Sequence, residues 1–358
     1  MKNKRMTVNR VSTTIILHIV LLALLVILML ANVLFGSVDI PVSDILEILF
    51  GNNAGTENSA WTFIVWHSRV PQMLTAAFAG AALATCGLML QTAFRNPLAG
   101  PSILGIDSGA SLGVALVMML LGGSISVAGM SVGGYVLTMV AAMSGAIGIM
   151  VLLSMLNALL KSTVMLLITG VIISYLTGSV ISLLQFCSNR DGLQSYVLWG
   201  MGNFSSVGSE HLSVFVGLVA LGMLFASLSV KTLDALLLGD RYAQNLGVKT
   251  TRSRQLLLFT TGLLSATTTA FCGPVSFIGL ATPHIVRFIS PSGSHRSLMP
   301  LTMLTGASIA LLCNLLCNLP DGSVLPINVL TPLIGAPVII YHTLSSNLSF
   351  KWRKGNKS

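Results

Sequence analysis

The chain has 358 residues, of which 54% are hydrophobic and only 8% are charged. A soluble domain carries about 25% charged residues, so this composition excludes an ordinary soluble protein. It predicts an all-α polytopic membrane protein. The net charge of +9 lies in short loops between apolar runs, where basic residues set orientation in the membrane. We therefore expect no nucleic-acid partner.

Ten apolar stretches follow one another in the chain, and residues 1–358 form one transmembrane domain in this interpretation. We expect about ten transmembrane helices, near residues 13–36, 70–93, 107–122, 129–153, 164–186, 211–229, 256–271, 273–290, 301–318 and 328–346. The first is too long for a signal-peptide core, so it is expected to be retained. Between the first two, residues 37–51 have the pattern of a short amphipathic helix at the interface.

Basic residues are divided unevenly between the two sides of this topology. Loops assigned to the inside hold 17 Lys and Arg, whereas the outside holds two, Arg69 and Arg190. Inner loops of membrane proteins are enriched in basic residues, so both termini are predicted to be cytoplasmic.

One polar stretch, residues 231–254, interrupts the apolar pattern between the sixth and seventh spans. It holds five of the 19 Lys and Arg, so it must face water. Two short helices are predicted inside it, with Gly239 as a hinge and Gly247 as a helix stop. A solvated loop and a helical docking element for a partner are both consistent with this composition.

The chain shows no chemistry of its own. No span interior carries a clear charge, because Asp107 is interpreted as a cap of the third span, with Ser108 as the alternative. This argues against an ion-coupled secondary transporter, which usually keeps a charge near the midplane. There is no phosphate loop and no hydrolase or protease motif, and Cys313 and Cys317 lack further metal ligands. No catalytic residue, metal or cofactor is predicted.

Several motifs occur together in order. Residues 69–110 contain R-x-P, GAALATCGLMLQ and RNPLAGPSILGIDSGA, and later come WGMG (199–202), GDRYAQNLG (239–247), GPVSFIGLATPHIVRFISPSGSHRSLMP (273–300) and TPLIGAP (331–337). Together they resemble the FecCD-type permeases, the membrane subunits of ABC importers for iron–siderophores, haem and cobalamin. The similarity extends over nearly the whole chain from Trp61 onward.

The resemblance implies a type II ABC importer permease, a homodimer in the bacterial inner membrane. Its partners would be two cytoplasmic ATP-binding subunits, which bind the ATP, an external substrate-binding protein, a metal-chelate substrate and membrane lipid. The polar stretch would then couple the permease to the ATPase. The residues assigned to coupling are Gly239, Asp240, Arg241, Ala243, Leu246 and Gly247.

Other roles follow from the same resemblance. Asn96, Pro97, Ser162 and Thr163 match a cytoplasmic gate, although Asn96 before Pro97 also suits a simple turn. The path is expected to be lined by Gly170, Ser174 and Gly178, on one stripe of the fifth span.

Docking of the binding protein is assigned to Arg69 alone. Gln72 and Asn318 stand where the family often has further basic residues, and Asn314 replaces a frequent Asp. The alternatives left open are an ion-coupled secondary transporter without an ATPase partner, a membrane enzyme and an exporter permease.

The predicted topology is tested by cysteine labelling. Cysteine placed at Thr56 or Gly322 is expected to react with an impermeant thiol reagent from outside, and cysteine at Gly355 only from inside. Labelling of position 355 from outside contradicts the topology.

Overall fold

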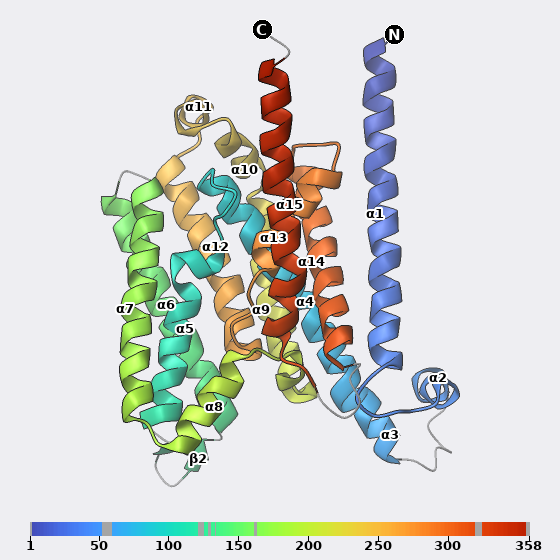
Figure 1. The fold of residues 1–358 in the computed structure, drawn as a ribbon, viewed down its shortest axis with the longest axis vertical. Helices are drawn as coiled ribbons and strands as arrows, with labels where there is room; N and C mark the ends of the chain where they lie inside the picture. Colours follow the sequence, from blue (N-terminus) through green and yellow to red (C-terminus); the bar gives the residue numbers. More distant parts are fainter. Residues whose placement is uncertain are drawn as a thin grey trace.

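The structure is a computed structural model that describes residues 2–51, 59–120, 125–127, 130–132, 134–160, 163–318 and 324–355. It is a bundle of long helices with a few short ones at its two ends (Figure 1). The first half contains α1 (Lys2–Leu34), α2 (Val42–Phe50), α3 (Ser59–Ile64), η1 (Val65–Arg69), α4 (Val70–Ala93), η2 (Pro101–Leu104), α5 (Ile106–Ala115), η3 (Leu116–Leu120), β1 (Ile125–Val127), β2 (Met130–Val132), α6 (Gly134–Leu159) and α7 (Thr163–Cys187). The second half contains α8 (Arg190–Gly200), η4 (Phe204–Ser206), α9 (Ser209–Leu228), α10 (Val230–Leu237), α11 (Asp240–Asn245), α12 (Thr250–Cys272), α13 (Ile278–Ile289), α14 (His295–Asn318) and α15 (Ile327–Gly355).

The predicted all-α membrane fold is confirmed. Within the described residues, seven helices are long and apolar enough to cross a membrane, and three shorter apolar helices occupy the places of the third, eighth and tenth spans. The second span is longer than expected, because α3 and η1 continue into α4 to give one stretch from Ala60 to Ala93. The fourth begins at Gly134 and not at residue 129, since the antiparallel pair β1–β2 precedes it.

The two ends of the bundle differ in what they carry. Figure 1 shows both chain termini at one end, called the terminal end here, and α10 and α11 lie at that same end. The opposite end carries α2, α3, α8 and β2. The polar stretch therefore lies on the same side as both termini, as the charge pattern predicts. The labelling positions Thr56 and Gly322 lie outside the described residues.

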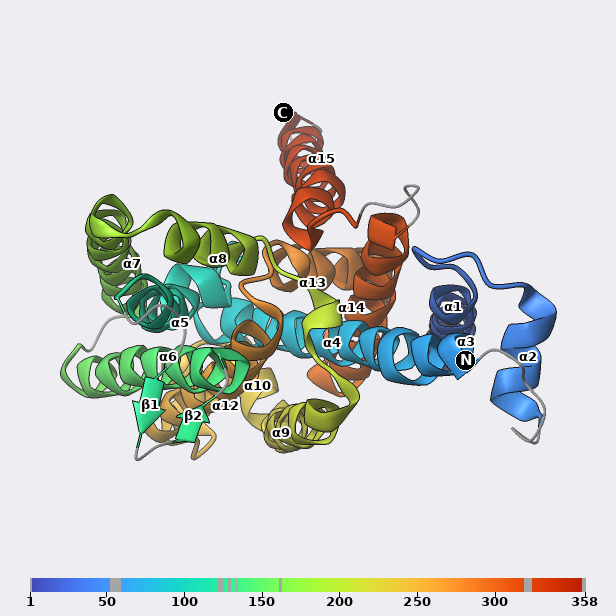
Figure 2. The same cartoon turned by 90° about the horizontal axis from the view of Figure 1, so that it is seen from below.

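Helix α4 is the centre of the bundle. In an 18-residue window of its membrane-length stretch 89% of the residues are buried, against 6% in the corresponding window of α1. Helices α14, α13, α12 and α9 all pack on it, and Figure 2 shows α4 running through the middle of the molecule. A helix that is apolar all round is expected in such a position, and the even apolar pattern of residues 70–93 is explained by it.

Glycines let the neighbours of α4 approach closely. A Cβ at Gly80 would lie 2.3 Å from the carbonyl oxygen of Gly306 on α14, and one at Gly87 would lie 1.6 Å from that of Gly279 on α13. Lipid supplies no hydrophobic force between helices, so membrane helices associate through close van der Waals contact at small residues. The 34 glycines of the chain serve this packing in part.

Filling one of these contacts should destabilise the bundle. Gly87→Ala is expected to cost about 1–3 kcal/mol, because overpacking forces backbones apart, and to lower the thermal unfolding midpoint of the purified protein. The matched control is Gly217→Ala on α9, where an added Cβ meets nothing within 4 Å. Equal stability of the two variants contradicts this account of the packing.

Candidate coupling surface and gate

The polar stretch folds as two short helices joined at glycines. Gly239 has φ of +102° between α10 and α11, and Gly247 has φ of +85° just after α11. A residue with a side chain adopts such φ values at a cost, which is why glycine suits both points. The predicted hinge and helix stop are therefore found at Gly239 and Gly247.

Apolar side chains project from this element into solvent. Leu238, Tyr242 and Leu246 are each more than half exposed, whereas Ala243 between them is fully buried. Exposed apolar groups gathered on a polar loop mark a surface for a partner. We call Leu238, Tyr242 and Leu246 the knuckle.

An ion-pair cluster ties the knuckle to the core. The Asp240 carboxylate accepts a hydrogen bond from Arg254 of α12 at 2.7 Å, and Arg95 lies 3.9 Å from the same oxygen. Arg95 follows the end of α4, and its φ of +48° turns the chain there. Its exposure makes the longer pair weak on its own. The contact nevertheless places the start of α11 directly against the loop that holds the predicted gate. Arg241 is exposed beside it.

A second attachment joins α10 to the same end of α4. Asp234 accepts hydrogen bonds from the backbone nitrogen of His295 at 2.7 Å and from its Nδ1 at 2.8 Å. The Nε2 of His295 lies 2.8 Å from the Thr92 hydroxyl on α4. Asp234 thus caps α14 from another helix and connects α10, α14 and α4. We call Asp234, His295 and Thr92 the latch.

The latch carries charge at neutral pH. Partial burial by itself raises the pKa of Asp234, but hydrogen bonds from His295 and Ser294 outweigh it and leave that pKa below its ordinary value. A carboxyl group whose pKa is lower in the folded protein than in the unfolded chain stabilises the fold at any pH above the unfolded-state pKa. That contribution to the free energy of unfolding is lost as the pH falls through the folded-state pKa. Protonation of Asp234 therefore needs a pH more acidic than an ordinary aspartate.

The gate loop has the geometry of a tight turn. The Asn96 side-chain oxygen accepts a hydrogen bond from the Leu98 nitrogen at 3.0 Å, as in an Asx turn. The carbonyl oxygen of Pro97 lies 2.8 Å from Nε2 of His284 on α13. Asn96 therefore forms the turn, and its gating role stays a prediction. Ser162 lies outside the described residues, and Thr163 is described only as the first residue of α7.

The stripe on α7 is only partly open. A Cβ at Gly170 would lie 2.8 Å from the carbonyl oxygen of Ile103, so Gly170 is a buried packing contact and the expectation that it lines the path is wrong. Ser174 is half-buried and bonds back to the Gly170 carbonyl at 3.0 Å. Gly178 faces open space. These two positions remain available to a path.

Asp107 is an acid inside the bundle, which the sequence analysis did not predict. Gly105 and not Asp107 precedes α5, and no side chain caps that helix. The Asp107 carboxylate instead accepts hydrogen bonds from Ser265 at 2.7 Å and Thr269 at 3.0 Å on α12. At 1.5 Å per residue these partners lie about 22 Å or more along α12 from its start. The expectation that no acidic or basic residue lies in a span interior is therefore wrong.

Arg69 does not present its guanidinium to an external partner. The residue is only 5% exposed. Its Nη1 donates to the carbonyl oxygens of Val33 at 2.8 Å and Leu34 at 3.0 Å, and its Nη2 donates to that of Val38. The guanidinium thus satisfies the free carbonyls at the end of α1. The expectation that Arg69 is an exposed docking residue is wrong for this reason.

The amide residues nearby form an interior network. Nε2 of Gln72 donates to Oδ1 of Asn314 at 3.0 Å, and Nδ2 of Asn314 donates to Oδ1 of Asn32 at 2.8 Å. Nδ2 of Asn32 donates to the Leu311 carbonyl oxygen at 3.0 Å. Each amide is buried and partnered, so the network joins α4, α14 and α1 without a charge. Gln72 is therefore a packing residue of the core.

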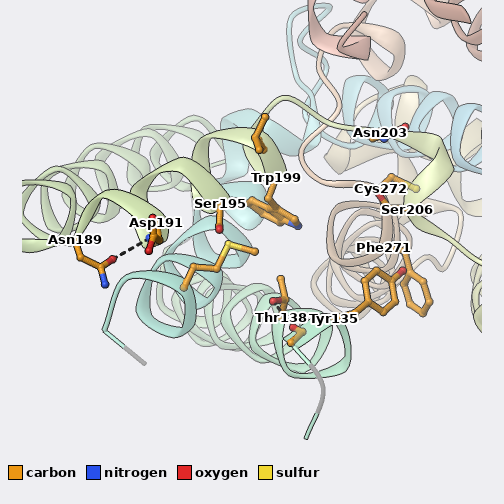
Figure 3. A pocket seen from close by; sticks show the side chains of 14 residues that line it. Tyr135, Thr138, Asn189, Asp191, Ser195, Trp199, Asn203, Ser206, Phe271 and Cys272 are labelled. Atoms are coloured by element: carbon orange, nitrogen blue, oxygen red, sulfur yellow. Dashed lines mark hydrogen bonds between the residues drawn. The ribbon is translucent and has the colours of Figure 1, made fainter. Parts of the chain in front are cut away.

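A cavity opens at the opposite end of the bundle. It encloses about 610 Å³ between α6, α8 and the end of α12. Figure 3 shows Trp199 and Ser195 of α8 facing Thr138 and Tyr135 of α6 across it, with Phe271 at one side. No Lys, Arg or His of the described chain lines this cavity.

Sequence reasoning missed the residues that attach the coupling element. Arg95 and His295 lie in quoted motifs, and Asp234 lies inside the polar stretch, but their partners are distant in the chain. A usable signal for Arg95 is its place immediately before the Asn96–Pro97 turn.

The assignment is decided by a family model. The model of the FecCD transport family matches residues 24–345. The chain is a member of the FecCD transport family. It is accordingly the permease subunit of an ABC importer, and in this family ATP hydrolysis lies in a separate subunit.

Relatives in this family differ in what they are named for. The molybdate import permease MolB of Haemophilus influenzae is 34% identical, over 89% of this chain and 93% of that protein. The vitamin B12 import permease BtuC of Vibrio cholerae is 34% identical, over 83% and 88%. The Fe(3+) dicitrate permease FecD of Escherichia coli is 35% identical, over 78% and 84%.

A solved structure agrees in fold. It is described as an inward-facing conformation of a metal-chelate type ABC transporter. It has 29% identity and a TM-score of 0.77, and the match covers 91% of this chain and 99% of that one. The type II importer permease fold predicted from the motifs is confirmed.

The buried guanidinium can be tested for a structural role. Arg69→Gln should lower stability by roughly 2–3 kcal/mol, because helix-end carbonyls lose charged donors. Thermal unfolding of the purified protein measures this. Arg190→Gln is the matched control, since Arg190 is an exposed residue at the same end. A loss of binding-protein affinity in Arg69→Gln without a loss of stability contradicts the structural role.

Proposed function

We propose that this FecCD permease imports a bulky metal chelate, of the iron–siderophore, haem or cobalamin type. The relatives named for Fe(3+) dicitrate and vitamin B12 and the metal-chelate type neighbour support this class. Another relative is named for import of molybdate, a smaller oxyanion. The cavity at the opposite end is lined by one acid, Asp191, and otherwise by uncharged residues, which is compatible with a large complex that must not be held tightly.

The observation that carries the mechanism is the double attachment of the coupling element. The knuckle offers an apolar surface to an ATP-binding subunit, which would hold the ATP. Asp240 with Arg95 and Arg254, and the latch, join that surface to the end of α4 and to the loop of Asn96 and Pro97. Motion of the knuckle is then transmitted to the gate by charged and hydrogen-bonded contacts, because packed interfaces switch between discrete arrangements.

The assembly follows from the same proposal. Two copies of the chain would face each other with the path between them, and two ATP-binding subunits would dock at the terminal end from the cytoplasm. An external binding protein would deliver substrate at the opposite end. The 17-to-2 distribution of basic residues supports this orientation in the bacterial inner membrane.

Asp107 favours one alternative, an ion-coupled transporter without ATPase partners. A buried carboxylate facing two hydroxyls is a feature of ion pathways. Family membership favours ATP-driven import, and Asp107 is then a bridge between α5 and α12. In proteoliposomes holding the ATPase subunit, uptake that needs ATP supports import. Uptake driven by an ion gradient alone supports the alternative.

Gly247→Pro tests the coupling. Proline fixes φ near −65° and lacks the N–H, whereas Gly247 has φ of +85° and donates to the Gln244 carbonyl oxygen at 2.9 Å. We expect the variant to insert and assemble, with uptake falling at least tenfold while ATP hydrolysis continues. The exposed neighbour Lys249→Ala is the matched control and should transport normally. Normal uptake by Gly247→Pro removes the coupling role.

The substrate class is tested through the binding protein. Purified from its native cells, it is expected to retain a chelate with visible absorbance and a mass that includes a metal. Retention of a colourless oxyanion such as molybdate contradicts the chelate assignment but leaves import intact.

A further inference from the structure

Two basic side chains at the terminal end of the bundle share one cavity. It encloses about 740 Å³ between the end of α9, the start of α10 and the first turns of α14. Lys231 and Arg296 line it, and both are exposed. The remaining wall is largely apolar and consists of Leu228, Val230, Met299, Pro300 and Met303, with Ser227 as the other polar residue.

Neither cation has an acidic partner among the described residues. The ion pairs found there involve Arg95, Arg254 and His295. Asp234 is one turn along α10 from Lys231, a spacing at which opposite charges commonly pair. Its two carboxylate oxygens are instead occupied by His295 and Ser294. Within the described residues the cavity therefore has two basic side chains that form no ion pair.

The depth of the cavity in the membrane indicates its ligand. Leu228 is the last residue of a membrane-length helix, and Met299 and Met303 lie on the first turns of another. Leu228 is largely exposed and Met303 is half-buried, whereas Met299 is buried at the back of the cavity. The exposed part of the apolar wall therefore lies on the outer surface of α9 and α14, while the two cations lie at the level where these helices end or begin. A phospholipid has the same arrangement, with a charged phosphate group at the membrane surface and an apolar acyl chain extending from it into the bilayer.

We propose that this cavity binds an anionic phospholipid of the leaflet at the terminal end, with Lys231 and Arg296 on the phosphate and Leu228 and Met303 along the acyl chain. The site would hold α10, and with it the coupling element, against α9 and α14 by a ligand drawn from the bilayer. This inference adds to the proposed import function, because the lipid composition of the membrane would then influence the position of the knuckle.

Arg296 also borders a second cavity, on the side of α1. That cavity, of about 640 Å³, is lined by His18, Ser292, Ser294 and Ser297, and the buried Ser297 hydroxyl has no hydrogen-bond partner. It contains no second Lys or Arg from the described chain. The pair of cations therefore places the headgroup on the side of Lys231.

The test is lipid binding by the purified full chain in detergent, followed by native mass spectrometry with palmitoyl-oleoyl phosphatidylglycerol and phosphatidylcholine. We expect tighter binding of phosphatidylglycerol. Lys231→Gln and Arg296→Gln should each weaken it about fivefold and leave phosphatidylcholine nearly unchanged. Millimolar inorganic phosphate should not displace the lipid. Arg252→Gln, which removes an exposed arginine that lines neither cavity, is the control for net charge and should bind normally.

Five results would overturn the proposal. The first is equal binding of phosphatidylglycerol and phosphatidylcholine. The second is an equal loss of phosphatidylglycerol affinity in Arg252→Gln and Lys231→Gln. The third is displacement of the lipid by inorganic phosphate alone, which indicates a free-anion site. The fourth is unchanged lipid affinity in Lys231→Gln with reduced retention of the ATP-binding subunit, which makes the cavity a protein-docking surface. Weaker lipid binding in Ser297→Ala but not in Lys231→Gln moves the headgroup to the α1 side and likewise contradicts the assignment. Because the assay requires no transport, its failure leaves the import proposal intact.

Discussion

The close approach of α4 to its neighbours is the constraint on which the rest of this structure depends. Glycine meets glycine where α4 crosses α14 and α13, at Gly80 with Gly306 and at Gly87 with Gly279. Backbones in direct contact leave little room for sliding, so α4 is fixed along its length. Its end at the terminal side, which carries the loop of Asn96 and Pro97, is therefore a rigid base for anything attached to it.

The polar stretch, residues 231–254, is attached to this end of α4. The packing of α4 is thereby connected with the proposed coupling to the ATP-binding subunit. Arg95 and Thr92 lie at or just beyond the end of α4, and each contacts a group that leads to the polar stretch between α9 and α12. A weak, exposed pair such as Arg95 with Asp240 contributes little to stability. Its value lies in geometry, since it places the start of α11 beside the loop of Asn96 and Pro97.

Two ionisable side chains connect helices in the interior of this protein. Arg69 closes the end of α1, and Asp107 bridges α5 to α12. The amides of Gln72, Asn314 and Asn32 occupy a third interior position without charge. Lys231 and Arg296, by contrast, are exposed at the terminal end, where we propose that an anionic headgroup binds.

The sequence by itself determined the number and order of the spans, the polar stretch with its two glycine turns, and the family, because each depends on local composition or on motifs read along the chain. It did not determine where single polar side chains point. Arg69 meets residues about 36 positions away and Asp107 meets a residue 158 positions away, and the 3.6-residue periodicity of a helix carries no information about such partners. Only the tertiary structure decided that Arg69 faces inward, that Gly170 is buried, and that Asp234 caps α14. For Arg69 and Asp234 the side chain satisfies polar groups that another helix brings to it, and Gly170 is covered by the backbone of Ile103 and Leu104.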